Sequence, residues 1–121
     1  TGASLVFLNV IDEVPPAYAY ELESGAPIDV TAIDDLRRKY GEESVTRLKE
    51  KAVADGITAT TSVVEGHPWQ EILTQAKNEG ADHIVIGSHG RRALAAAVLG
   101  NVAVNVIHGA TVPVTVIPVR D

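Results

Sequence analysis

The sequence predicts an α/β domain with a parallel sheet and helices on both faces. Two observations carry this prediction: short apolar strands without polar alternation, and regular alternation of these strands with helical segments. The chain has 121 residues, the length of one domain, and its 45% apolar share is that of a globular protein. We therefore expect a single domain over residues 1–121, with right-handed crossovers between its strands.

The first half of the chain predicts a strand, a long loop and a helix. The run Leu5–Ile11 is almost wholly apolar, as in a strand buried on both faces. Residues 12–30 carry prolines, a glycine and several acidic residues, and predict a long loop. A helix is expected from a cap at Thr31, with acidic residues in its first turn, to about Ala54.

One apolar stripe is expected to form the buried side of this first helix. Its members recur mostly every three or four residues. They are Ile33, Leu36, Tyr40, Val45, Leu48 and Ala52. Gly56 ends the helix, and the β-branched run 58–64 predicts the second strand.

The second half continues the alternation. Pro68 is expected in the first turn of a helix that Gly80 closes, with a buried face made by Trp69, Ile72, Leu73 and Ala76. A short strand over 83–86 leads into the glycine-rich turn 87–90. A helix over about 102–108, capped by Gly109, precedes a last strand at 112–117. Pro113 cannot donate to a sheet, so it belongs at the start of that strand or at an edge.

Composition excludes several classes of function. Cysteine is absent, which excludes disulfides, thiolate zinc sites and cysteine nucleophiles. The net charge of −6 argues against a sequence-independent nucleic-acid binder, and no apolar run is long enough to span a membrane. The four histidines lack the helical pairing of a metal site. No P-loop, dinucleotide fingerprint or serine elbow is present.

The glycine-rich segment is the strongest candidate for a binding site. Ligands of open α/β sheets lie beyond the carboxyl ends of the strands, which is where Gly87–Gly90 stands. Gly100 and Asn101 open the next helix, whose N-terminus attracts phosphate. Arg91 and Arg92 add cations in an acidic chain. The segment therefore predicts a phosphate cradle, with the alternative that these glycines only make tight turns.

The same segment resembles the nucleotide-loop motif of the universal stress protein family. Gly87 and Gly90 are followed after nine residues by Gly100, where the family has Gly, two residues, Gly, nine residues, Gly, then Ser or Thr. The resemblance extends over the first strand, the Gly66–Ile72 helix entry, the 81–87 strand and the last strand. It implies a three-layer, Rossmann-like fold of the adenine nucleotide alpha hydrolase type, with strand order 3-2-1-4-5.

The resemblance also implies ATP, with or without Mg, as the ligand of the nucleotide-binding branch of the family. Val10 would line the adenine or ribose region, and Ile86 would pack on the base or sugar. The remaining expected contacts are Gly87, His89 and Gly90 by their backbone, Arg91 as a cation, and Gly100, Asn101 and Val102 at the helix start.

Two features depart from the family pattern. Asn101 stands where the motif has Ser or Thr, and we expect weakened rather than abolished binding; alternatively, Asn101 is only a helix cap. The family's first strand and helix have no counterpart here. We therefore expect this chain to be a fragment, or another chain to supply the unit, with roughly 35–40 further residues upstream.

The leading functional hypothesis is a cytoplasmic stress-response protein that binds ATP or a related adenine nucleotide as a regulatory or protective module. It is not expected to be a dedicated enzyme, and any ATP hydrolysis is expected to be slow. The alternative is a dimeric interaction module without nucleotide, and a more distant one is a hydrolase that uses the same pocket. A homodimer is expected through the last strand, Val112–Val119, with Val114, Val116 and Pro118 at the contact.

Overall fold

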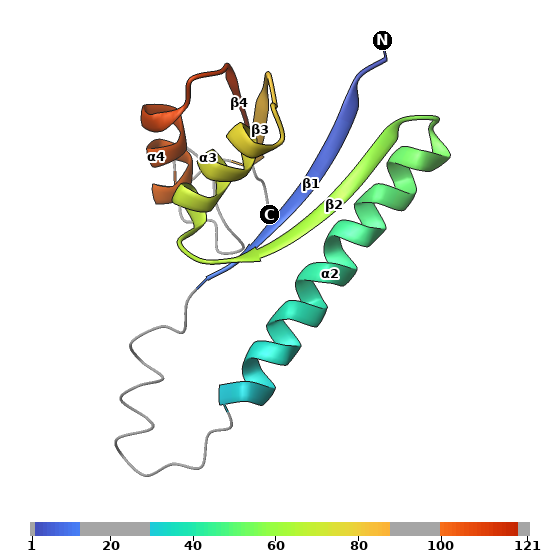
Figure 1. Cartoon of the computed structure of the whole chain (residues 1–121), viewed down its shortest axis with the longest axis vertical. Coiled ribbons are helices and arrows are strands. Elements are labelled where there is room, and N and C mark those ends of the chain that lie inside the picture. Colours follow the sequence, from blue (N-terminus) through green and yellow to red (C-terminus); the bar gives the residue numbers. More distant parts are fainter. Residues whose placement is uncertain (1, 13–29, 88–99, 119–121) are drawn as a thin grey trace. The chain divides into compact units, whose positions relative to one another are not determined.

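The chain forms two compact units in a computed structural model that describes residues 2–12, 30–87 and 100–118. The first unit comprises Thr1–His67 and the second Pro68–Asp121. Each unit contains one pair of parallel strands, so the expected α/β class with parallel strands is confirmed. The element order also follows the prediction, with strands and helices alternating along the chain (Figure 1).

In the first unit, residues 2–12 and 30–67 form a two-stranded parallel sheet with one long helix along it. Strand β1 (Ser4–Ile11) pairs with β2 (Thr58–Glu65) in the register Ser4↔Thr58 to Ile11↔Glu65. Helix α2 (Val30–Ala54) connects the two strands and packs on both (Figure 1). The helix ends at Ala54, as expected, and Gly56 lies in the turn that follows, where its φ of 79° favours glycine. The N–H of Ile57 donates to the carbonyl of Ala52 at 2.9 Å and closes that turn.

The expected apolar stripe of α2 is correct only in part. Val45 and Ala52 are buried with Ile11 and Ala59 in the core of this unit, at 4–7% exposure. Leu36, in contrast, is 67% exposed, and Tyr40 and Leu48 are about half exposed. Positions 36 and 45 are separated by about two and a half helical turns, so they lie on opposite sides of the helix. Most of this rotation comes from the step of five residues between Tyr40 and Val45, which turns about 140° around the helix.

A glycine on α2 sets how closely the helix approaches β1. Gly41 is buried, and a Cβ at this position would lie 2.6 Å from Oδ1 of Asn9. The helix therefore rests on the strand at a point where one partner has no side chain and the other has a flat amide. Asn9 consequently faces α2, together with the other odd-numbered residues of β1, because side chains alternate along a strand.

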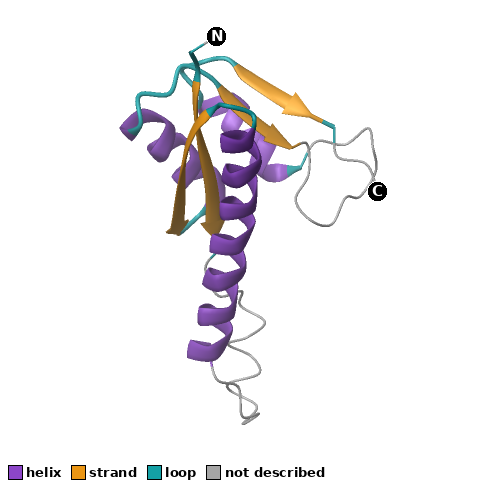
Figure 2. Cartoon of the chain, turned by 90° about the vertical axis from the view of Figure 1, so that its right-hand side faces the viewer, coloured by secondary structure: helices purple, strands orange, loops and turns teal. Residues whose placement is uncertain are grey.

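The described residues of the second unit form two helices and a short parallel sheet. Helix α3 (Pro68–Asn78) begins at the expected proline, and β3 (Ile84–Gly87) pairs in parallel with β4 (Val114–Ile117). Helix α4 (Asn101–Gly109) packs against α3 (Figure 1), and Figure 2 shows β3 and β4 side by side, running in the same direction. The core of this unit is made by Ile84, Ala103 and Val106, each at most 8% exposed. The expected buried face of α3 is only half-buried, since no residue of α3 is fully covered.

Three expected boundaries are wrong. Helix α2 begins at Val30, so Thr31 lies inside the helix and no acidic residue stands in its first turn. Gly109 is the last residue of α4 rather than its cap, since Ala110 follows in an extended conformation. Its lack of a side chain instead accommodates α3, because a Cβ there would lie 2.5 Å from Leu73. The last strand begins only after Pro113, which accepts a hydrogen bond from the N–H of Ile84 at 3.0 Å.

No helix in the described part of the chain combines the length and the hydropathy that a membrane crossing requires.

The contact of Gly41 with Asn9 gives a prediction for stability. Alanine favours a helix by about 1 kcal/mol over glycine. We nevertheless expect Gly41→Ala to lower the free energy of unfolding by about 1 kcal/mol, because the new methyl group must displace the Asn9 amide. In an Asn9→Ala background the same change should raise the free energy of unfolding by up to about 1 kcal/mol. Chemical denaturation of the four proteins measures both effects. Equal destabilisation in both backgrounds would contradict the contact.

Candidate functional site

The parallel pairing in the second unit brings the end of β3 and the start of α4 to the same edge of the sheet. Only residues 110–113 separate the last residue of α4 from β4, which starts at the amino edge. The 9 residues of α4 rise roughly 13 Å, close to the length of the 4-residue strand. The helix therefore runs back along the sheet, and its N-terminus reaches the carboxyl edge where β3 ends at Gly87.

Strand β3 contributes two of the expected site residues. Gly87 is its last residue, paired with Ile117, and Ile86 is paired with Val116. Ile86 is half-buried, on the same face of the sheet as the buried Ile84. The site on this side is thus a glycine backbone next to an apolar side chain.

Helix α4 contributes a start without a side-chain cap. Its N-cap is Gly100, with φ −67° and ψ 156°, and no described side chain caps the N–H groups of the first turn. The first intrahelical bond runs from the N–H of Val104 to the carbonyl of Gly100 at 3.1 Å. The N–H groups of the three preceding helical residues have no acceptor one turn earlier. They carry the positive end of the helix dipole, which attracts anions.

Asn101 is the first residue of the helix and not its cap, which corrects the alternative drawn from the sequence. It is exposed, and its carbonyl accepts a hydrogen bond from Nδ2 of Asn105 at 2.9 Å. This bond ties the first turn together through the backbone of Asn101. The side chain of Asn101 is thus not used as the cap of α4.

The structure also shows a donor that the sequence analysis did not include. The N–H of Ala103 lies in the first turn beside those of Asn101 and Val102, which were expected. Its position three residues after Gly100 was the available signal, since the third helical N–H of any helix lacks an intrahelical acceptor.

Val10 lies in the first unit, at the carboxyl end of β1. It pairs with Val64, and it stands on the sheet face opposite to Asn9 and therefore away from α2. Both valines are half-buried. The residue is thus at the expected end of its strand, in the first unit, whereas Ile86, Gly87 and Gly100–Val102 belong to the second unit. His89, Gly90 and Arg91 lie outside the described residues.

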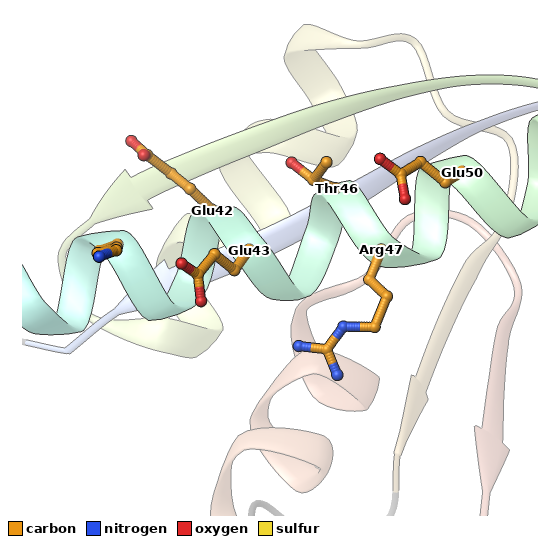
Figure 3. Close-up of a pocket in the computed structure, with 6 residues that line it drawn as sticks. Glu42, Glu43, Thr46, Arg47 and Glu50 are labelled. Atoms are coloured by element: carbon orange, nitrogen blue, oxygen red, sulfur yellow. The ribbon is translucent and has the colours of Figure 1, made fainter.

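The described residues also bear on metal binding, on the histidines and on surface hollows outside this site. Among residues 2–12, 30–87 and 100–118, no group of three acidic or histidine side chains could hold a metal ion. His83 is engaged with Thr115, with 2.6 Å between Nε2 and Oγ1. One shallow hollow lies on α2 alone (Figure 3). A second is lined by the ends of α3 and α4, the first residue of β3 and the residues between α4 and β4, at the amino edge of the sheet.

Comparison with known proteins places the chain among universal stress proteins. The sequence model of the universal stress protein family matches residues 1–118. Universal stress protein YxiE of Bacillus subtilis is 38% identical over 88 residues, which cover 70% of this chain and 60% of that protein. Universal stress protein MJ0531 of Methanocaldococcus jannaschii is 36% identical over 85 residues, which cover 70% of this chain and 50% of that protein. The chain thus spans about half to three fifths of these relatives.

Solved structures agree with this relationship. The structure of the hypothetical protein MJ0577, described as a structure-based assignment of its biochemical function, superimposes with a TM-score of 0.77 at 27% identity. The match covers 98% of this chain and 77% of that one. The crystal structure of the hypothetical protein PH0823 gives 0.60 at 28% identity, with 96% and 76% covered. By sequence and by fold, the chain belongs to the universal stress protein family.

Proposed function

We propose that this chain binds ATP or a related adenine nucleotide and acts as a regulatory or protective module. The observation that carries the proposal is the start of α4, at the carboxyl edge where β3 ends. Its N-cap is Gly100, which has no side chain to accept from the first N–H groups of the helix. A phosphate group there would receive the N–H groups that the helix leaves without acceptors. The spacing Gly87, Gly90, Gly100 of the family's nucleotide-loop motif supports the same ligand.

The proposed contacts are of two main kinds, backbone N–H groups for the phosphates and apolar side chains for the base and sugar. The backbone at Gly100, Asn101 and Val102 would hold the phosphates, with Mg as an accompanying ion. Apolar side chains would receive the base and sugar, namely Val10 and Ile86. The remaining proposed contacts are the backbones of Gly87, His89 and Gly90 and the cation of Arg91.

We propose slow hydrolysis at most. The described part of the site, residues 86–87 and 100–102, holds no titratable side chain that could activate water. The site is therefore suited to retaining a nucleotide, as a cytoplasmic regulatory module would.

For the architecture we propose one domain with strand order 3-2-1-4-5. These numbers count the five strands of the family, in which β1 to β4 of this chain are the second to the fifth. The two observed pairs, β2 with β1 and β3 with β4, are the neighbours that this order requires on either side of its central strand. Apolar residues of both pairs are exposed, among them Val6 at 41% and Val85 at 65%. A βα unit between β1 and β3, from the same protein or from another chain, would cover such residues in a three-layer fold.

A homodimer through residues 112–119 remains a proposal, and so does the alternative function of a dimeric interaction module without nucleotide. Among the described strands β4 pairs only with β3, so its other edge is open for a second copy. Val114 and Val116 are half-buried, while Thr115, Ile117 and Pro118 are exposed. The alternative is favoured by one observation, the Asn at position 101 in place of Ser or Thr.

The first prediction for binding concerns the charge at the start of α4. Gly100→Asp places a carboxylate on the N–H groups proposed for the phosphates, so the Kd for Mg-ATP should rise at least about tenfold. Aspartate caps helices slightly better than glycine, so the thermal midpoint should stay level or rise. Isothermal titration and thermal denaturation measure the two effects.

Gly100→Ser is the matched control, because serine also caps the helix but carries no charge. It should retain most of the binding. Equal loss in both variants would mean that the side-chain volume at position 100 matters and not its charge. Unchanged binding in both would place the nucleotide elsewhere, and no binding in the parent chain would favour the interaction module.

The second prediction concerns Asn101. Asn101→Ser restores the residue of the family motif, whose hydroxyl is expected to donate to a phosphate oxygen. The Kd for Mg-ATP should fall roughly three- to tenfold, the effect of about one hydrogen bond. Asn101→Ala serves as the control and should bind no better than the parent. If serine and alanine had the same effect, residue 101 would contribute only through its backbone.

A further inference from the structure

The outer face of α2 carries charges that have no partner within the described part of the chain. Its exposed charged residues are Lys39, Glu42, Glu43, Arg47 and Glu50. None of these side chains makes an ion pair with another described residue, although several are spaced four apart. The ion pair that α2 does make joins Arg38 to Glu65 of β2, at 3.7 Å.

These residues surround a shallow hollow on the helix. Figure 3 shows Glu42, Glu43, Thr46, Arg47 and Glu50 all projecting from α2, with the short side chain of Thr46 among longer ones. Within the described residues, no other element lines this hollow. It is thus a feature of one helix face, on the side opposite to the buried Val45 and Ala52.

Six residues of this face follow a heptad spacing. Positions 36, 39, 43, 46, 50 and 53 alternate steps of three and four, which keeps them on one line along roughly 27 Å of helix. The two ends of the line are apolar and exposed, Leu36 at 67% and Val53 at 54%. The four positions between them are Lys39, Glu43, Thr46 and Glu50.

The six residues on this line are complementary to the same six residues of a second copy that runs in the opposite direction. In an antiparallel pair about a two-fold axis, Leu36 meets Val53 of a second copy and Lys39 meets Glu50 of that copy. Glu43 meets Thr46, whose hydroxyl donates to carboxylates. Each contact occurs twice. A parallel in-register pair would instead oppose Lys39 to Lys39 and Glu43 to Glu43, which repel each other.

We propose that the outer face of α2 is a self-association surface, on which a second copy of this chain pairs its own α2 in the antiparallel direction. The surface uses no residue of the proposed nucleotide site. Exposed ion pairs are weak and screened by salt, so the association is reversible and strongest at low ionic strength.

The pairing is tested by exchanging charges. Lys39→Glu or Glu50→Lys alone creates like charges at two symmetric contacts and should weaken self-association about tenfold in sedimentation equilibrium at low salt. An equimolar mixture of the two variants should associate again as a heterodimer, and so should the double variant with itself. Lys77→Glu and Glu79→Lys, exposed sites of the second unit with the same changes of charge, are the controls and should have no effect.

The register is tested separately from any other interface. The chain has no cysteine, so Leu36→Cys with Val53→Cys provides the only thiols. A short bismaleimide should link the double variant into covalent dimers, and a mixture of the two single variants likewise. Each single variant alone should stay monomeric in a denaturing gel, because the two copies of one position lie about 25 Å apart.

Two results would overturn the proposal. Cross-linking of the single variants as efficient as that of the double variant would exclude the antiparallel register. Sedimentation that is unchanged by either charge reversal, or an absence of cross-linked dimer, would mean that this face only meets solvent. A dimer through β4 would not affect the cross-linking result or the effect of the charge reversals, because it does not depend on the pairing of α2 with α2.

Discussion

Hydrogen bonding between β3 and β4, in the same direction, positions every part of the candidate site in the second unit. Two parallel neighbours need a connection that returns along the sheet, and α4 is that connection. Its length matches the strands, so its N-terminus arrives where β3 ends. The donors at the start of α4 and the glycine at the end of β3 meet because of this pairing, without any side chain that holds them together.

The order and type of the elements could be predicted from the sequence because they depend on local patterns. Apolar runs such as Leu5–Ile11, and the turns at Gly56 and Gly80, are local signals, and the structure agrees with them. The buried face of α2 could not be predicted as well. An apolar residue such as Leu36 satisfies a local spacing rule even when the sheet lies on the other side of the helix. Which side is buried depends on the strands, which are distant in sequence.

In the candidate site, too, some features could be predicted from the local sequence and others could not. The position of Gly100 at a helix start followed from composition and spacing, and the resemblance to the family led to the proposed ligand. The role of Asn101 did not follow, because asparagine is equally good as a cap and as a first-turn residue with a free side chain. The structure assigns the cap to Gly100. Gly109 was misjudged for a related reason: a glycine near a helix end is typical of a cap, but here its missing side chain leaves room for Leu73.

The contact of Gly41 with Asn9 has a consequence for strand register. A slip of β1 by one residue would turn Leu8 or Val10 toward the helix and Asn9 toward the other face. The branched side chains do not match the flat amide that fits at Gly41, so the slipped pairing loses its close approach. The same slip would turn Val10, which faces away from α2, toward the helix. A glycine in the middle of a helix thus selects one alignment of a strand, and with it the direction in which a residue of the proposed site points.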